Sequence, residues 1–275
     1  MDDTSAVVIP LVVYNLLLIG VGVWASRRNT SVEDFYLAGR GLGPWVAAIS
    51  ASASSSSAWT LLGVSGAAYA WGLPALWLFP ATIGGFLVNW LWVAPRLQAL
   101  NANEGAITLS AVVAPAGLGA QRTLVLRIAA AIIVFCFVFY VASQFEAAGK
   151  AFESVFGLSK DLSIVMGSVI VLAYTLLGGF WAVSITDTVQ GLLMCIAAVV
   201  LPLAAFLAVG GTAELSTGLA QLAGDGSPLA GLSLAACVLF VLGTLGIGIG
   251  YPGQPHVVNR FMALRDTQSL RRGRL

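Results

Sequence analysis

The sequence predicts an all-α integral membrane protein with about seven transmembrane helices. Of the 275 residues, 59% are hydrophobic and 9% are charged, whereas an average soluble domain carries about 25% charged residues. Seven apolar stretches come close to or exceed the ~20 residues that a membrane-spanning helix needs. They comprise residues 6–25, 44–70, 73–94, 128–148, 162–182, 188–209 and 231–250. Residues 95–127 are more polar and are interrupted by glycine and proline, so we expect them to lie along the inner surface of the membrane.

The distribution of positive charge predicts how these spans are oriented. The chain opens with Asp2 and Asp3, where a secretory signal would carry basic residues, so we expect an uncleaved first helix with its N-terminus outside. The outer loops then hold Lys150 and Lys160, and the other 11 of the 13 Lys and Arg residues, Arg260 included, fall in inner loops. This is the positive-inside pattern. It predicts a multi-pass protein of the cytoplasmic membrane with its C-terminus inside.

The second span contains an unusual run of hydroxyl groups. Six serines lie between Ile49 and Trp59, namely Ser50, Ser52, Ser54, Ser55, Ser56 and Ser57. Lipid offers these groups no water, so they must face protein, a cavity or a bound ligand. A helix this polar can open its backbone hydrogen bonds and present carbonyl oxygens to a cation. The run therefore predicts a solute and ion site.

The seventh span is also interrupted, between residues 243 and 255. The interrupting residues are Gly246, Gly248, Gly250, Pro252, Gly253 and Pro255. Proline removes a backbone donor and glycine is a weak helix former, so we expect this stretch not to sustain a regular helix. The alternative is that the small residues serve close helix packing.

The two interrupted spans are five helices apart, so they cross the membrane in opposite directions. That is the pattern of a five-plus-five inverted repeat, in which the first helix of each repeat unwinds near the midplane and binds substrate and ion. The chain then forms a single transmembrane domain holding the first half of such a fold. Residues 1–42 supply an extra N-terminal helix and inner loop, residues 43–210 the first repeat, and residues 211–275 the first helix of the second repeat.

Four sequence blocks, residues 33–43, 65–69, 174–191 and 250–264, resemble the sodium:solute symporter family, most closely its sodium/proline branch. The resemblance implies sodium-coupled symport of a small organic solute, such as the amino acid proline, by alternating access. It implies a transporter and no enzyme, with sodium as coupling ion, no other cofactor and no nucleic-acid partner. The partners it implies are the solute, the lipid bilayer and further transmembrane helices that lie outside this chain. We therefore expect a fragment, a truncated product or part of a longer sensor, and no sodium-driven uptake by these 275 residues alone.

The same resemblance implies site residues. The backbone carbonyls of Ala53 and Ser56 would bind sodium, together with Ser55, Ser57 and Asp187. Ser54, Ser57 and Trp59 would lie near the solute, and the seventh span adds Tyr251, Pro252 and Gln254. The proline branch has an aspartate where this chain has Ser55, which predicts weaker sodium binding or a different ion.

Other polar residues have plainer interpretations. Asp187 has the placement of a carboxylate at a helix N-terminus, favoured by the helix dipole. Glu146 and Lys150 have the spacing of an i,i+4 pair at the membrane interface, and a substrate or proton role is the alternative. Arg40 has the position of an anchor for the inner loop, with gating as the alternative. His256 has the position of a helix cap or an interface residue.

Two competing functions remain open from the sequence. Residues 63–66 read Gly-Val-Ser-Gly, which resembles the motif of rhomboid intramembrane proteases, with Ser65 as nucleophile and His256 as its only available partner. We expect the two residues to lie at opposite ends of their spans. Transporter-like modules also occur as sensors of membrane histidine kinases.

Overall fold

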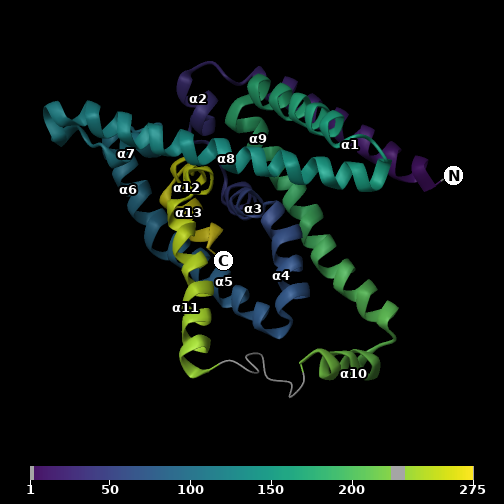
Figure 1. Cartoon of the computed structure of the whole chain (residues 1–275). Helices are drawn as coiled ribbons and strands as arrows, with labels where there is room; N and C mark the ends of the chain where they lie inside the picture. Colours follow the sequence, from purple (N-terminus) through teal and green to yellow (C-terminus); the bar gives the residue numbers. More distant parts are fainter. Residues whose placement is uncertain (1–2, 224–232, 275) are drawn as a thin grey trace.

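The computed structural model describes residues 3–223 and 233–274, and all its regular elements are helical (Figure 1). In chain order they are α1 (Asp3–Ser26), α2 (Val32–Leu37), η1 (Ala38–Arg40), α3 (Pro44–Ser55), η2 (Trp59–Gly63), α4 (Val64–Trp71), η3 (Leu73–Trp77), α5 (Leu78–Val88), η4 (Asn89–Val93) and α6 (Ala94–Glu104). There follow α7 (Leu109–Val113), η5 (Ala116–Gln121), α8 (Arg122–Phe156), α9 (Lys160–Val209), α10 (Thr212–Ala223), α11 (Leu234–Gly250), η6 (Tyr251–Gly253), α12 (Pro255–Met262) and α13 (Thr267–Gly273).

Within the described residues, five helical stretches are long and apolar enough to cross a membrane. They are Val8–Ser26, Leu73–Leu100, Ala116–Ser154, Lys160–Val209 and Leu234–Gly253. The difference from the seven predicted spans has two causes. The second predicted span is divided between α3 and α4, and the fifth and sixth predicted spans both lie on α9.

Helix α9 changes direction sharply at Gly179 (Figure 1). The backbone there has φ 55° and ψ −150°, a conformation that is essentially open only to glycine. A Cβ at this position would also lie 2.8 Å from the carbonyl oxygen of Phe35, so the start of the chain packs directly into the bend. Beyond the bend, Gly191 packs against Ile49 of α3. The bend therefore brings the second half of α9 against the serine-rich helix.

The two interrupted spans are discontinuous, adjacent and antiparallel, as the sequence predicts. The α3–α4 break at Ser56 has φ −84° and ψ 108°, and the η6–α12 break at Gln254 has φ −86° and ψ 103°. Leu42, before α3, forms an isolated parallel bridge with Leu264, after α12. Nearer the middle of the molecule, the side chain of Ser50 accepts a hydrogen bond from Arg260. Contacts thus run forward along α3 and backward along α12, which places the two breaks near each other.

The expectation for the glycines of the seventh span is wrong in part. Helix α11 stays regular through Gly246, Gly248 and Gly250, and the break is confined to residues 251–254. A Cβ at Gly248 would lie 2.3 Å from the carbonyl oxygen of Ala81 in α5. Small residues here let two backbones approach closely, which is the packing role that the sequence left as the alternative.

The most buried hydrophobic cluster lies where α3, α6, α12 and α13 meet. Its largest fully buried side chains include Leu37, Leu42, Val257, Val258 and Phe261. By contrast, apolar side chains of α8 and of the second half of α9 are widely exposed, as expected of surfaces that contact lipid or further helices. This buried cluster packs α12 against α3 next to the two breaks.

Candidate functional site

The serines at the first break turn back onto their own helix. The Ser56 N–H donates to the carbonyl oxygens of both Ser52 and Ala53, at 3.1 Å each. The hydroxyls of Ser55 and Ser56 donate to the Ser52 carbonyl at 2.8 and 3.1 Å. These bonds satisfy the carbonyls of Ser52 and Ala53 in the last turn of α3, which would otherwise lack partners in a membrane.

Beyond the break, the chain restarts as helix with help from two side chains. The Trp59 N–H donates to Ser57 Oγ at 3.1 Å, so Ser57 caps the following turn. The Ala58 N–H donates to Gln144 Oε1 of α8 at 2.8 Å. Gln144 lies 86 residues away in the sequence, and the sequence analysis did not identify it.

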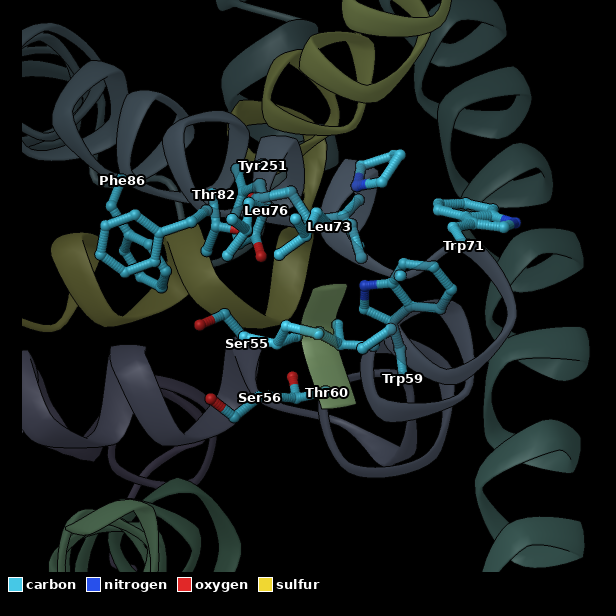
Figure 2. A pocket seen from close by; sticks show the side chains of 18 residues that line it. Ser55, Ser56, Trp59, Thr60, Trp71, Leu73, Leu76, Thr82, Phe86 and Tyr251 are labelled. Atoms are coloured by element: carbon cyan, nitrogen blue, oxygen red, sulfur yellow. The ribbon is translucent and has the colours of Figure 1, made fainter. Parts of the chain in front are cut away.

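A cavity of ≈ 890 Å³ opens beside the first break (Figure 2). Ser55, Ser56 and Thr60 lie on one side, and Thr82, Phe86 and Tyr251 lie on the other. The remaining lining is mostly apolar and comprises Trp59, Val64, Ala68, Trp71, Gly72, Leu73, Pro74, Ala75, Leu76, Leu78, Phe79 and Leu219. Within the part of the chain that the structure describes, no charged side chain lines the cavity. A few hydroxyls in an apolar cavity suit a small molecule with an apolar body and a polar end.

A polar cluster lies next to the break and centres on Asp187. Its Oδ2 accepts hydrogen bonds from Ser50 Oγ at 3.0 Å and from Ser54 Oγ at 2.7 Å, and it forms an ion pair with Arg260 Nη2. The interpretation of Asp187 as a helix-start carboxylate is wrong, because α9 bends at Gly179 and Asp187 lies two turns beyond the bend. Asp187 instead joins α9 to α3 and α12.

Arg260 is the residue of this cluster whose position differs most from the sequence prediction. The charge pattern predicts that Arg260 lies in an inner loop. In the structure Arg260 is only 3% exposed, and its Nε donates to Ser50 Oγ at 2.8 Å. A buried guanidinium needs a paired carboxylate, and Asp187 supplies it. The useful clue was an arginine between two apolar pairs, Val257-Val258 and Phe261-Met262, because an ionisable residue inside an apolar segment usually has a buried partner.

The residues predicted for the site fall into four groups. Ser55, Ser56, Trp59 and Tyr251 line the cavity, while Ser54 and Asp187 belong to the adjacent polar cluster. Ala53 and Ser57 take part in the hydrogen bonds of the first break. Pro252 and Gln254 form the turn of the second break, and Gln254 Oε1 is buried without a hydrogen-bond partner among the described residues. Their roles toward sodium and solute stay predictions.

The charged residues Glu146, Lys150 and Arg40, which lie outside the cavity, all form ion pairs. The predicted Glu146–Lys150 pair is confirmed at 3.2 Å, and Lys160 adds a second contact to Glu146 at 2.9 Å. Arg40 pairs with Glu33 and donates to the carbonyl of Ala106 at 3.3 Å, which ties the loop before α3 to the segment after α6.

The only histidine lies in an aromatic environment. The His256 ring stacks on Tyr140 with centroids 5.3 Å apart, and it meets Phe137 edge-on at 5.5 Å. This places His256 between α12 and α8, and its role as a helix cap or interface residue stays a prediction. Ser65, the other residue of the protease hypothesis, donates to the carbonyl of Leu62 in its own segment.

A multi-pass helical membrane protein with two adjacent broken helices and a cavity beside them has the architecture of a transporter. The sequence model of the sodium:solute symporter family matches residues 35–275, so the chain belongs to this family. The family is one of symporters, and the curated relatives are named as transporters.

Named relatives support this placement. The chain is 38% identical over 269 residues to an osmoregulated proline transporter of Bacillus subtilis (strain 168), covering 98% of this chain and 54% of that protein. It is 36% identical over 261 residues to a sodium/proline symporter of Escherichia coli (strain K12), covering 94% of this chain and 50% of that protein. The chain thus spans about half the length of these relatives.

A solved structure shows the same fold. A sodium-coupled sialic acid symporter in a substrate-bound outward-open state matches 99% of this chain and 56% of its own chain. The TM-score is 0.78 and the sequence identity is 21%. The helices described here therefore form part of a larger transporter fold.

Proposed function

We propose that this chain is part of a sodium-coupled symporter for a small amino acid, with proline as the first candidate, working by alternating access in the cytoplasmic membrane. Its N-terminus lies outside and its last described helix lies inside. The observation that supports the proposal best is the cavity between the two breaks, because it combines hydroxyls from the first break with the Tyr251 ring from the second. The names of the curated relatives favour proline as solute.

The first break offers a donor set that suits sodium. Sodium is a hard cation that prefers oxygen ligands, and the break gathers serine hydroxyls and the carbonyl ends of α3. Each carbonyl oxygen has two lone pairs, so Ala53 can accept from Ser56 and still contact a cation. We assign Ala53, Ser55 and Ser56 to the ion, with the missing ligands supplied by helices outside this chain.

Asp187 is a poor direct ligand for sodium in this arrangement. Its Oδ2 already receives Arg260, Ser50 and Ser54, so most of its charge is compensated. We assign Asp187 and Ser54 to holding the first break in place. The solute contacts we propose are Trp59 and Tyr251, together with Phe86 and Thr82 of α5, which the sequence analysis did not include.

The test is uptake of radiolabelled proline by the full-length transporter in proteoliposomes, with an inward sodium gradient and with potassium or choline in its place. Proline accumulation that requires sodium supports the proposal. Accumulation that is independent of sodium excludes sodium coupling, and an absence of proline uptake under every gradient excludes proline as the solute. The 275-residue chain reconstituted alone is the matched control, and we expect no sodium-stimulated accumulation from it.

A further inference from the structure

The second break leaves one backbone carbonyl without its regular helical donor. In an α-helix, the carbonyl oxygen of Tyr251 would accept from the N–H of residue 255. Residue 255 is proline, which has no N–H. The N–H of Gln254 donates to Tyr251 O instead, at 3.2 Å and in the tighter geometry of η6.

A second donor reaches the same carbonyl from another part of the chain. Asn89 Nδ2 donates to Tyr251 O at 3.2 Å across 162 residues of sequence. The Asn89 residue is 0% exposed and begins η4, a π-helical segment directly after α5. Single π-helical turns inside α-helices often occur at functional sites.

The amide of Asn89 is used for its donor alone. Among the described residues its Oδ1 is buried and has no hydrogen-bond partner. An unpaired buried acceptor costs free energy, so a buried asparagine here is expensive unless its N–H groups serve a purpose. The bond to Tyr251 O is the purpose that the geometry shows.

The bond from Asn89 holds the backbone of Tyr251, and the Tyr251 side chain lines the solute cavity. A Cβ at Gly85, one turn before Asn89, would lie 2.7 Å from the Tyr251 ring and 2.6 Å from the carbonyl oxygen of Gly248. The ring of Phe86 lies 5.1 Å from that of Tyr251, and both rings line the cavity. Asn89 itself does not line the cavity, so any effect on the solute passes through Tyr251.

We propose that Asn89 is a positioning residue of the transporter, whose side-chain amide replaces the donor that Pro255 lacks and thereby holds Tyr251 in its place in the solute cavity. The part of this inference that concerns the solute rests on the function proposed above. The part that concerns the backbone of the second break does not.

The first experiment measures proline uptake by the full-length transporter carrying Asn89→Leu, which keeps the branched heavy-atom skeleton of the side chain and removes the donor. We expect the KM for proline to rise about tenfold while Vmax changes by less than about twofold. The reason is that the lost hydrogen bond alters the shape of the site and so weakens proline binding. Asn15→Leu is the matched control, because Asn15 Nδ2 also donates to a backbone carbonyl, that of Leu11, within α1 and away from both breaks. An unchanged KM in Asn89→Leu would overturn the solute part of the inference.

A second substitution separates hydrogen bonding from packing. Pro255→Ala provides an N–H at residue 255, which can donate to Tyr251 O as in a regular helix once Gln254, now extended with ψ 103°, turns to a helical ψ. If Asn89 acts as the replacement donor, Asn89→Leu should do less harm in the Pro255→Ala background than in the wild type. If the two substitutions have independent, additive effects on KM, Asn89 acts through packing and the proposal is wrong.

A readout without transport covers the case in which proline is not the solute. Hydrogen–deuterium exchange of the full-length protein in lipid nanodiscs reports on the amides of residues 251–258. We expect Asn89→Leu to speed this exchange and Pro255→Ala to reverse the change. That result with no proline uptake by the wild type would exclude proline as the solute and keep the backbone role, whereas unchanged exchange would reject the backbone role.

Discussion

The two broken helices have nearly the same backbone geometry but are built by different residues. Ser56 and Gln254 share almost identical φ and ψ values at the break. In the first break, the serine hydroxyls bond back to the Ser52 carbonyl of the same helix. In the second break, the prolines have no backbone N–H to donate. The side chain of Asn89, which comes from another helix, donates to the Tyr251 carbonyl oxygen instead.

This difference indicates which break can exchange its hydrogen bonds when an ion binds. A hydroxyl can rotate away from a carbonyl and leave that oxygen to a cation, so the bonds of the first break can be exchanged when an ion arrives. A proline cannot regain its N–H, so the second break is permanent and its shape depends on a fixed partner. We infer that the first break is suited to transient ion binding and the second to holding the wall of the cavity.

The largest effect should come from the ion pair that joins α9 to α12 beside the two breaks. Arg260→Met leaves the largely buried carboxylate of Asp187 without its cation, and the loss should approach the cost of breaking a fully buried pair, about 3–5 kcal/mol. Thermal unfolding of the purified full-length protein in nanodiscs measures the loss. The double variant Asp187→Asn/Arg260→Met should be more stable than the Arg260→Met single variant. Equal stability of the two variants would show that the pair does not hold the breaks together.

The next prediction tests whether the first break acts on sodium more than on the solute. Gln144→Leu removes the acceptor of the Ala58 N–H and should cost about 1–3 kcal/mol by leaving that group unpaired. Because the lost bond belongs to the first break, the sodium concentration for half-maximal uptake should rise more than the proline KM. Gln121→Leu, at an exposed position before α8, is the control. A larger change in the proline KM than in sodium activation would contradict the division of roles.

A charge added at the first break should act on the ion directly. Ser55→Asp places a carboxylate at the edge of the cavity, where a nearby cation would be attracted more strongly than in water. We expect sodium activation of uptake to occur at lower sodium concentration, measured at several pH values. If no cation binds there, the unpaired carboxylate would take up a proton and uptake would become pH-dependent without tighter sodium activation.

The smallest effect should come from an exposed polar contact of α8 that joins neither break. Glu146 is exposed and pairs with Lys150 and Lys160, and exposed ion pairs contribute little to stability. Glu146→Gln should leave both sodium activation and the proline KM unchanged. A clear change in either constant would favour the substrate or proton role that the sequence left as the alternative.

The sequence by itself determined the membrane-embedded helical class and the location of both breaks. Six serines in one apolar span and two prolines at residues 252 and 255 report directly on whether a backbone can keep its own hydrogen bonds. The extent of the second break was overestimated, because glycines in a membrane helix also serve close packing, as Gly248 does against Ala81. Local composition does not separate these two uses.

Only the tertiary structure decided which side chains complete the open backbone bonds and the buried charges. Gln144, Asn89 and Arg260 come from helices that are far from their partners along the chain, at separations of 86, 162 and 73 residues. The bend at Gly179 decides that Asp187 meets Arg260 rather than starting a helix. The physical reason is that a buried polar group must find a partner, but the packing of the helices chooses which partner is within reach.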